Sequence, residues 1–243
     1  MKNQNHSAQN LLSDALNFFY RKRKMNNYDV QEEILQMTVK LYPRHDNYAA
    51  VDVKVKLLNL FYSTGIKAID KVTKKIMSIK NIDTILNEKK HSKDLVDKIA
   101  ELELKEDKRR TNYSFATKYC ALHKPDKYPI YDSIVGKVFT KLFFEGKLYP
   151  YVYTRKKIKA MNEMTKTEFE NKLHNYDFFV EVYNHFMRDY GLTTLSYRQV
   201  DWYLWGSYKD GNHKSKIEEL APLKEGVDYI VLKQKVIDQT ITI

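Results

Sequence analysis

The chain has 243 residues, and its 42 Lys and Arg against 31 Asp and Glu give a formal net charge of +11. A basic chain of this length can fill one larger domain or two small lobes, and its charge favours a polyanionic partner such as nucleic acid. One cysteine excludes an internal disulfide, no apolar run reaches the roughly 18 residues of a membrane span, and the opening MKNQNHSAQN lacks a signal-peptide core, so we expect a cytoplasmic protein.

Helices are expected to dominate, because the chain holds only 7 glycines and 5 prolines. Apolar residues at helical spacing predict a first helix up to Tyr62, and Gly65 separates it from a second. A third helix precedes a run of basic residues. In chain order, the residues that define these helices are Val51, Val55, Leu58 and Tyr62, then Ile66, Ile69, Val72 or Thr73, Ile76 and Ile79, then Leu95, Ile99 and Leu102.

Two capping boxes mark helix starts in the second half of the chain. Thr165 with Glu168 opens a helix that Gly191 closes, and the pair Ser196 and Gln199 opens a shorter helix that ends near residue 206. Residues 229–232 and 241–243 are β-prone, so a short β hairpin is expected at the C-terminus. The predicted fold class is therefore all-α.

The stretch from Ser114 to Val135, SFATKYCALHKPDKYPIYDSIV, places a lysine and an aspartate on separate elements. Lys118 lies on a predicted helix that the prolines of the following linker end. Asp132 stands where an N-cap residue opens the next helix, which runs to Gly146. Folding could bring the two side chains together.

This segment resembles the helix-hairpin-helix DNA glycosylase superfamily, which includes 8-oxoguanine glycosylase and endonuclease III. Lys118 within FATKYC and Asp132 within PIYDSIV match the family's catalytic lysine and aspartate. The resemblance implies a helical fold with two lobes, about 1–104 and 105–243, around a basic cleft. Residues 109–113, ahead of the lysine helix, lack the family's glycine-rich turn, and the lone Cys120 excludes a four-cysteine iron-sulfur cluster.

Base excision makes the sugar's anomeric carbon positive, so a nearby carboxylate stabilises the transition state and a neutral amine can attack that carbon. The resemblance gives these roles to Asp132 and Lys118. Attack by the lysine forms a Schiff base and permits strand cleavage at an abasic site. Alternatively, water attacks and Lys118 assists. In the simplest alternative, Lys118 is a solvated surface residue and Asp132 is a helix cap that contributes about 1 kcal/mol.

The expected partner is DNA, double-stranded with a damaged or modified base that must be flipped out to be reached. Four basic residues lie just ahead of the lysine helix, whose N-terminus also favours an anion. Three further candidates surround the motif. The predicted DNA contacts are Lys105, Lys108, Arg109, Arg110, Tyr113, Ser114 and Tyr131.

No metal or cofactor is expected, because the histidines show no zinc-type spacing and no glycine-rich phosphate loop is present. Cys120 and His123 could pair as thiolate and imidazolium, although a buried thiol is commoner. No obligate protein partner is evident.

The leading hypothesis is a DNA glycosylase, with or without abasic-site lyase activity, in base excision repair or in restriction of foreign (phage) DNA. One alternative is a catalytically silent helical module that binds DNA or RNA. Another is a basic interaction protein with an acidic partner. Release of a free base and the salt dependence of binding distinguish these three hypotheses.

Overall fold

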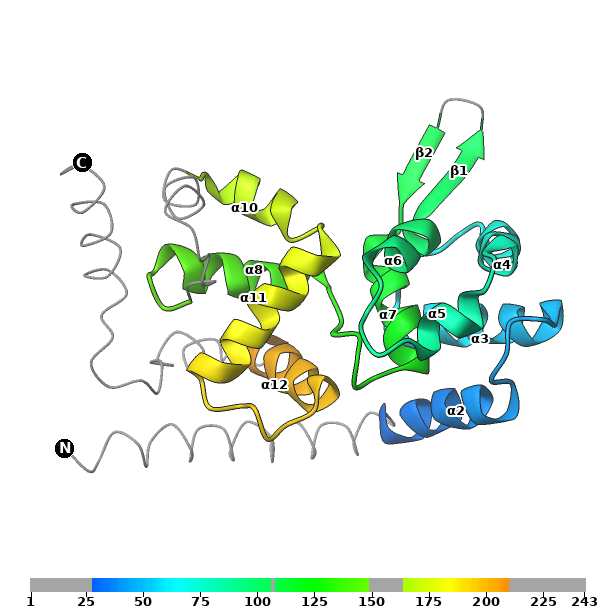
Figure 1. Ribbon diagram of the computed structural model, residues 1–243, viewed down its shortest axis with the longest axis horizontal. Helices are drawn as coiled ribbons and strands as arrows, with labels where there is room; N and C mark the ends of the chain where they lie inside the picture. Colours follow the sequence, from blue (N-terminus) through cyan, green and yellow to red (C-terminus); the bar gives the residue numbers. More distant parts are fainter. Residues whose placement is uncertain (1–27, 106–107, 149–163, 210–243) are drawn as a thin grey trace. The chain divides into compact units, whose positions relative to one another are not determined.

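A computed structural model describes residues 28–105, 108–148 and 164–209, and these residues are mostly helical, which confirms the all-α expectation (Figure 1). The described chain forms two compact units. The first contains residues 28–132 and 196–201, and the second contains 133–148, 164–195 and 202–209. The division therefore falls after Asp132 and not near residue 105, where the lobes were predicted to meet. None of the described helices is long and apolar enough to cross a membrane.

The first unit is built from six helices among its described residues. The two helices expected around Gly65 are present, and this glycine has the positive φ of 69° that a tight turn between them needs. Asn47 caps the first of the two by accepting the Ala50 N–H at 3.1 Å. In chain order the helices are α2 (Tyr28–Leu41), α3 (Tyr48–Tyr62), α4 (Ile69–Ser78), α5 (Ile82–Asn87), α6 (Lys93–Ala100) and α7 (Tyr113–His123).

A short antiparallel hairpin stands between α6 and α7. Its strands are β1 (Glu101–Lys105) and β2 (Lys108–Thr111). The prediction of a helix through Leu102 is wrong beyond Ala100, because the sequence Glu-Leu-Glu-Leu-Lys alternates with the period of a strand. The hairpin closes where the Asn112 N–H donates to the Ala100 carbonyl at 2.8 Å. This closure sets the start of α7.

The second unit packs α8 (Ser133–Phe144), α10 (Lys166–Lys172) and α11 (Tyr176–Asp189) around aromatic side chains. Phe143 and Phe169 stack with centroids 4.3 Å apart, and Phe139 meets Phe186 at 5.3 Å. Both bonds of the Thr165 and Glu168 capping box are present, as predicted.

The single helix expected from Thr165 to Gly191 is in fact two helices. Asn175 starts α11 by accepting the Phe178 N–H at 3.2 Å. Gly191, with φ of 66°, follows its end as predicted. The last helix of the described residues, α12 (Tyr197–Lys209), continues past residue 206. The hairpin expected at 229–243 lies outside the described residues.

Candidate functional site

A buried threonine fastens the proline-containing loop to α7. The Tyr131 N–H donates to Thr117 Oγ1 at 3.1 Å, and the hydroxyl of Thr117 lies 3.3 Å from the Tyr131 carbonyl oxygen and 3.0 Å from that of Ser114. Lys118 and Asp132 are the residues that follow the two bonded partners. The bonds therefore hold the two preceding residues, Thr117 and Tyr131, together although they are fourteen positions apart.

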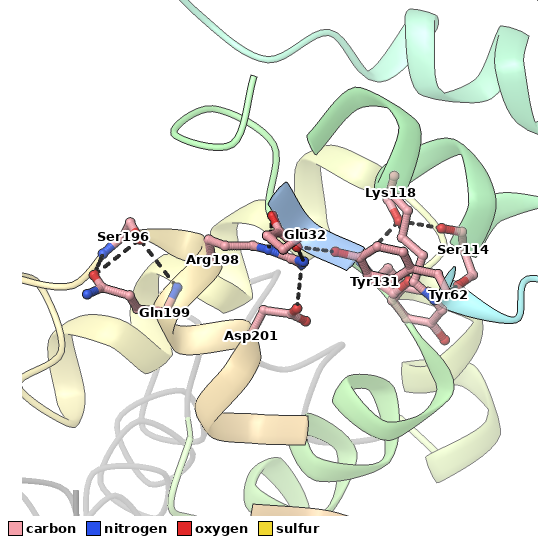
Figure 2. Close-up of polar contacts among 10 residues, drawn as sticks. Glu32, Tyr62, Ser114, Lys118, Tyr131, Ser196, Arg198, Gln199 and Asp201 are labelled. Carbon is pink, nitrogen blue, oxygen red and sulfur yellow. Dashed lines mark hydrogen bonds and ion pairs between the residues drawn. The ribbon is translucent and has the colours of Figure 1, made fainter. Parts of the chain in front are cut away.

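Lys118 is not a solvated surface lysine, since only 8% of it is exposed. Its Nζ donates to Ser114 Oγ at 3.1 Å and lies 5.7 Å from the centroid of the Tyr62 ring (Figure 2). Ser114, predicted to contact DNA, thus holds the lysine. The tyrosine ring offers its negative face to the cation.

Arg198, at the start of α12, also contacts the Tyr62 ring: its guanidinium carbon Cζ lies 5.1 Å from the ring centroid. Its guanidinium pairs with both carboxylate oxygens of Glu32 and lies 3.1 Å from Oδ2 of Asp201 (Figure 2). The Tyr62 hydroxyl also donates to Glu32, at 3.2 Å. Lys118, Tyr62, Glu32, Arg198 and Asp201 form what we call the Arg198 cluster.

The pKa of Asp201 is affected by both predicted catalytic residues. Burial raises the pKa of this carboxyl to about 7, although Arg198 opposes the rise. The charge of Asp132 raises the same pKa further and that of Lys118 lowers it. Both charges therefore act on one carboxyl, so Lys118 and Asp132 share the neighbourhood of the Arg198 cluster.

A small pocket opens beside the cluster. Lys118, Glu32, Tyr62 and Arg198 line it together with apolar side chains that include Leu58 and Ile130. Its free space is scarcely enough for one water molecule, so it does not hold a nucleobase in this conformation.

The other predicted DNA contacts are placed as follows. Tyr113 and Tyr131 are buried, and their rings pack on each other at 4.9 Å with a tilt of 56°. Their faces serve the core of the first unit here. The backbones of Lys105, Lys108, Arg109 and Arg110 lie in the β1–β2 hairpin, whereas their side chains lie outside what the structure describes.

A second polar group, which the sequence did not suggest, is buried near the C-terminal end of α7. His45 Nδ1 lies 2.6 Å from Asp83 Oδ1, and the His45 and His123 rings are 4.7 Å apart. Among the described residues, His45 Nε2, His123 Nε2 and the Tyr119 hydroxyl have no hydrogen-bond partner. Lys54 is fully buried close by and donates to the carbonyls of Tyr42 and Arg44. We call His45, Tyr119 and His123 the histidine cluster.

Cys120 and His123 do not form an ion pair. Burial raises the pKa of the Cys120 thiol and lowers that of the His123 imidazole, so both stay neutral. Cys120 is therefore a buried thiol, the commoner of the two alternatives that the sequence left open.

Comparison with known proteins gives a family. The HI_0787_N family model, which describes an N-terminal domain, matches residues 12–127. An uncharacterized protein of Haemophilus influenzae (strain ATCC 51907) is 35% identical over 162 residues, which cover 67% of this chain and 68% of the relative. The chain belongs to the HI_0787_N family. No solved structure matches it significantly.

The segment matched by the HI_0787_N model contains only part of the candidate site. Glu32, Tyr62 and Lys118 lie within it, whereas Asp132, Arg198 and Asp201 follow it in the chain. The histidine cluster lies wholly inside the matched segment.

Proposed function

We propose that this protein is a DNA glycosylase that removes a damaged or modified base, with Lys118 as the nucleophile and Asp132 as the carboxylate that stabilises the sugar cation. One observation carries the proposal: the bonds between Thr117 and Tyr131 hold the residue before Lys118 against the residue before Asp132, on two separate elements. The resemblance of residues 114–135 to the helix-hairpin-helix glycosylases gives this pair its chemistry. The net charge of +11 suits a DNA partner.

In the proposed reaction, the Lys118 ammonium group first loses a proton to solvent, and the neutral Nζ then attacks C1′ of the flipped nucleotide. The C1′–N bond breaks, and the base leaves with its electron pair and takes up the proton that the attacking nitrogen releases. Asp132 stabilises the positive charge on the sugar as the bond lengthens. Opening of the sugar ring then gives a Schiff base, from which elimination cleaves the strand. Repair of the cell's own DNA or restriction of phage DNA would both use this chemistry.

Borohydride trapping tests the lysine. We expect the full chain to form a covalent adduct with a duplex that contains an abasic site, and Lys118→Ala to form none. Lys137→Ala removes an exposed lysine on α8 and serves as the matched control. No adduct with the wild-type protein would exclude attack by the lysine.

Base release tests the carboxylate. A panel of duplexes, each with one modified base, is incubated with wild-type protein and with Asp132→Asn, and abasic sites are counted. We expect the substitution to slow release by at least about 100-fold, the scale of losing one charge-stabilising group. Asp126→Asn, at an exposed aspartate of the same loop, should act like wild type. Equal rates for all three proteins would remove Asp132 from the mechanism.

The second candidate is a helical DNA- or RNA-binding module without chemistry. The tightness of the pocket beside Lys118 favours it, since a base has no room there unless the pocket opens. Under this alternative the protein binds nucleic acid in a salt-dependent manner, yet every duplex in the panel stays intact.

A further inference from the structure

The outer face of α2 carries four large apolar side chains that are exposed. Val30 is 52% exposed, Ile34 37%, Met37 53% and Leu41 69%. Their spacing of four, three and four residues places them within about 60° of arc on a helix that turns 100° per residue. The buried residues of α2, Leu35 and Thr38, lie on a different face. We call the four exposed residues the α2 stripe.

The spacing of the α2 stripe is that of the a and d positions of a coiled coil. Such positions are apolar because they insert between side chains of a facing helix, and the described residues leave these four open to solvent. A contiguous apolar face of this kind marks an interaction site more often than an ordinary surface does. The question is which helix covers it.

Charge along one edge of the stripe indicates the occupant. Glu33 and Lys40 stand at the same flanking position of successive heptads, and both are exposed. Among the described residues, neither has an ion-pair partner. When two copies of α2 lie antiparallel, Ile34 faces Met37 of the other copy and Glu33 comes opposite its Lys40, twice by symmetry. In a parallel pair Glu33 would face the uncharged Thr38.

We propose that two copies of this protein associate through the α2 stripe, with the two α2 helices antiparallel and Glu33 of each paired with Lys40 of the other. The helix of 14 residues is about 21 Å long and presents two heptads. So small an interface is typical of weak, reversible association. The dimer should therefore form and dissociate with concentration in the micromolar range or above.

Analytical ultracentrifugation of the full chain, from about 1 μM to about 1 mM, tests the proposal. We expect a monomer–dimer equilibrium for the wild type. Met37→Lys should weaken association more than about tenfold, because two charged side chains replace the centre of the apolar contact. Leu60→Lys is the matched control, since Leu60 is 70% exposed on α3 and lies outside the stripe. A wild type that stays monomeric throughout would overturn the proposal.

Charge reversal tests the antiparallel arrangement. Glu33→Lys and Lys40→Glu should each weaken association by about two- to tenfold. Either substitution turns both symmetry-related pairs into pairs of like charge. The double variant restores both pairs with the original net charge and should associate like the wild type. Failure of the double variant to recover would overturn the antiparallel arrangement. A monomeric wild type whose melting temperature falls with Met37→Lys would mean that the chain covers its own stripe.

Discussion

Arg198 holds together two carboxylates that are largely buried. Glu32 and Asp201 both pair with it, and their side chains are only 20% and 11% exposed. Breaking a buried pair from one side costs more than the pair contributes, since the remaining charge stays desolvated. The arginine is thus the structural centre of its cluster.

Arg198→Ala should lower the free energy of unfolding by about 2–4 kcal/mol, measured by urea denaturation. Lys56→Ala is the matched control. It removes an ion pair with Asp52 in which the lysine side chain is 59% exposed, and should cost less than about 1 kcal/mol. Equal effects of the two substitutions would show that the Arg198 cluster adds no more than a surface pair.

The histidine cluster predicts how stability changes with pH. Burial lowers the pKa of His45 and of His123 in the folded protein below the 6.5 of a free imidazole. Between the folded and unfolded pKa values, the unfolded chain binds more protons, so stability rises with pH in that window. The contribution is complete above pH of about 6.5 and is lost as the pH falls below it.

Urea denaturation between pH 7 and pH 5 measures this effect. The raised pKa of Asp201 acts in the opposite direction over this range, so the variants are compared with the wild type. We expect His123→Gln to lose less stability than the wild type as the pH falls. His91→Gln alters a histidine outside the cluster and should leave the wild-type slope unchanged. A slope that His123→Gln does not reduce would place the acid sensitivity elsewhere in the chain.

At the scale of elements, the loop after α7 depends on the hydroxyl of Thr117. Replacing Thr117 with valine keeps the shape of the side chain but leaves the buried Tyr131 N–H unpaired. Such a group costs about 1–3 kcal/mol. If Lys118 and Asp132 act together, the same substitution should also slow base release. The loop would lose its bond at Tyr131, and Asp132 is the next residue along the chain.

Thr140→Val provides the comparison for Thr117→Val. Thr140 is 4% exposed, and among the described residues its hydroxyl has no hydrogen-bond partner. Its replacement by valine should be neutral or stabilising in thermal unfolding. If both variants lose the same stability, the loss comes from fitting valine into a helix and not from the bond to Tyr131.

Local sequence patterns predicted which helices exist better than they predicted the residues at which those helices begin and end. The capping boxes at Thr165 and Ser196 are present because each needs only residues three positions apart. The break at Asn175 was missed because the apolar spacing continues across it. The helix over 28–41 was missed, because its apolar residues lie on two faces and blur the periodicity.

The candidate site was predictable only where its parts are close in sequence. Lys118 and Asp132 belong to one short segment that a family resemblance could mark. Glu32 and Arg198 are 166 positions apart, and no spacing rule links an ordinary glutamate to an ordinary arginine over that length. The histidine cluster joins His45 to α7 in the same long-range way. Tertiary packing alone brings such residues together.

At the scale of the whole molecule, the basic excess should govern binding to nucleic acid. Each lysine or arginine that contacts a phosphate releases counterions, so affinity falls steeply with salt. Removing the same charge from two different places distinguishes binding at one basic region from binding to the whole surface. The β1–β2 hairpin is the place that the sequence favours.

Reversing Arg109 and Arg110 to glutamate should weaken DNA binding and flatten its dependence on salt by about one unit of slope per lost phosphate contact. Fluorescence anisotropy at several salt concentrations measures both quantities. Reversal of the exposed Lys89 and Lys90 changes the net charge equally and serves as the control. Identical losses in the two double variants would mean that DNA responds to total charge and not to the hairpin.

The first unit is discontinuous, because residues 196–201 complete what residues 28–132 begin. A ribosome that adds about 5–20 residues per second needs roughly ten to thirty seconds to travel the 166 positions from Glu32 to Arg198. Throughout that time the nascent unit carries an acidic side chain beside Tyr62 with no guanidinium to neutralise it. The first unit is therefore completed only after residues 133–195 of the second unit have been made, and a ribosome that stalls before residue 198 leaves it incomplete.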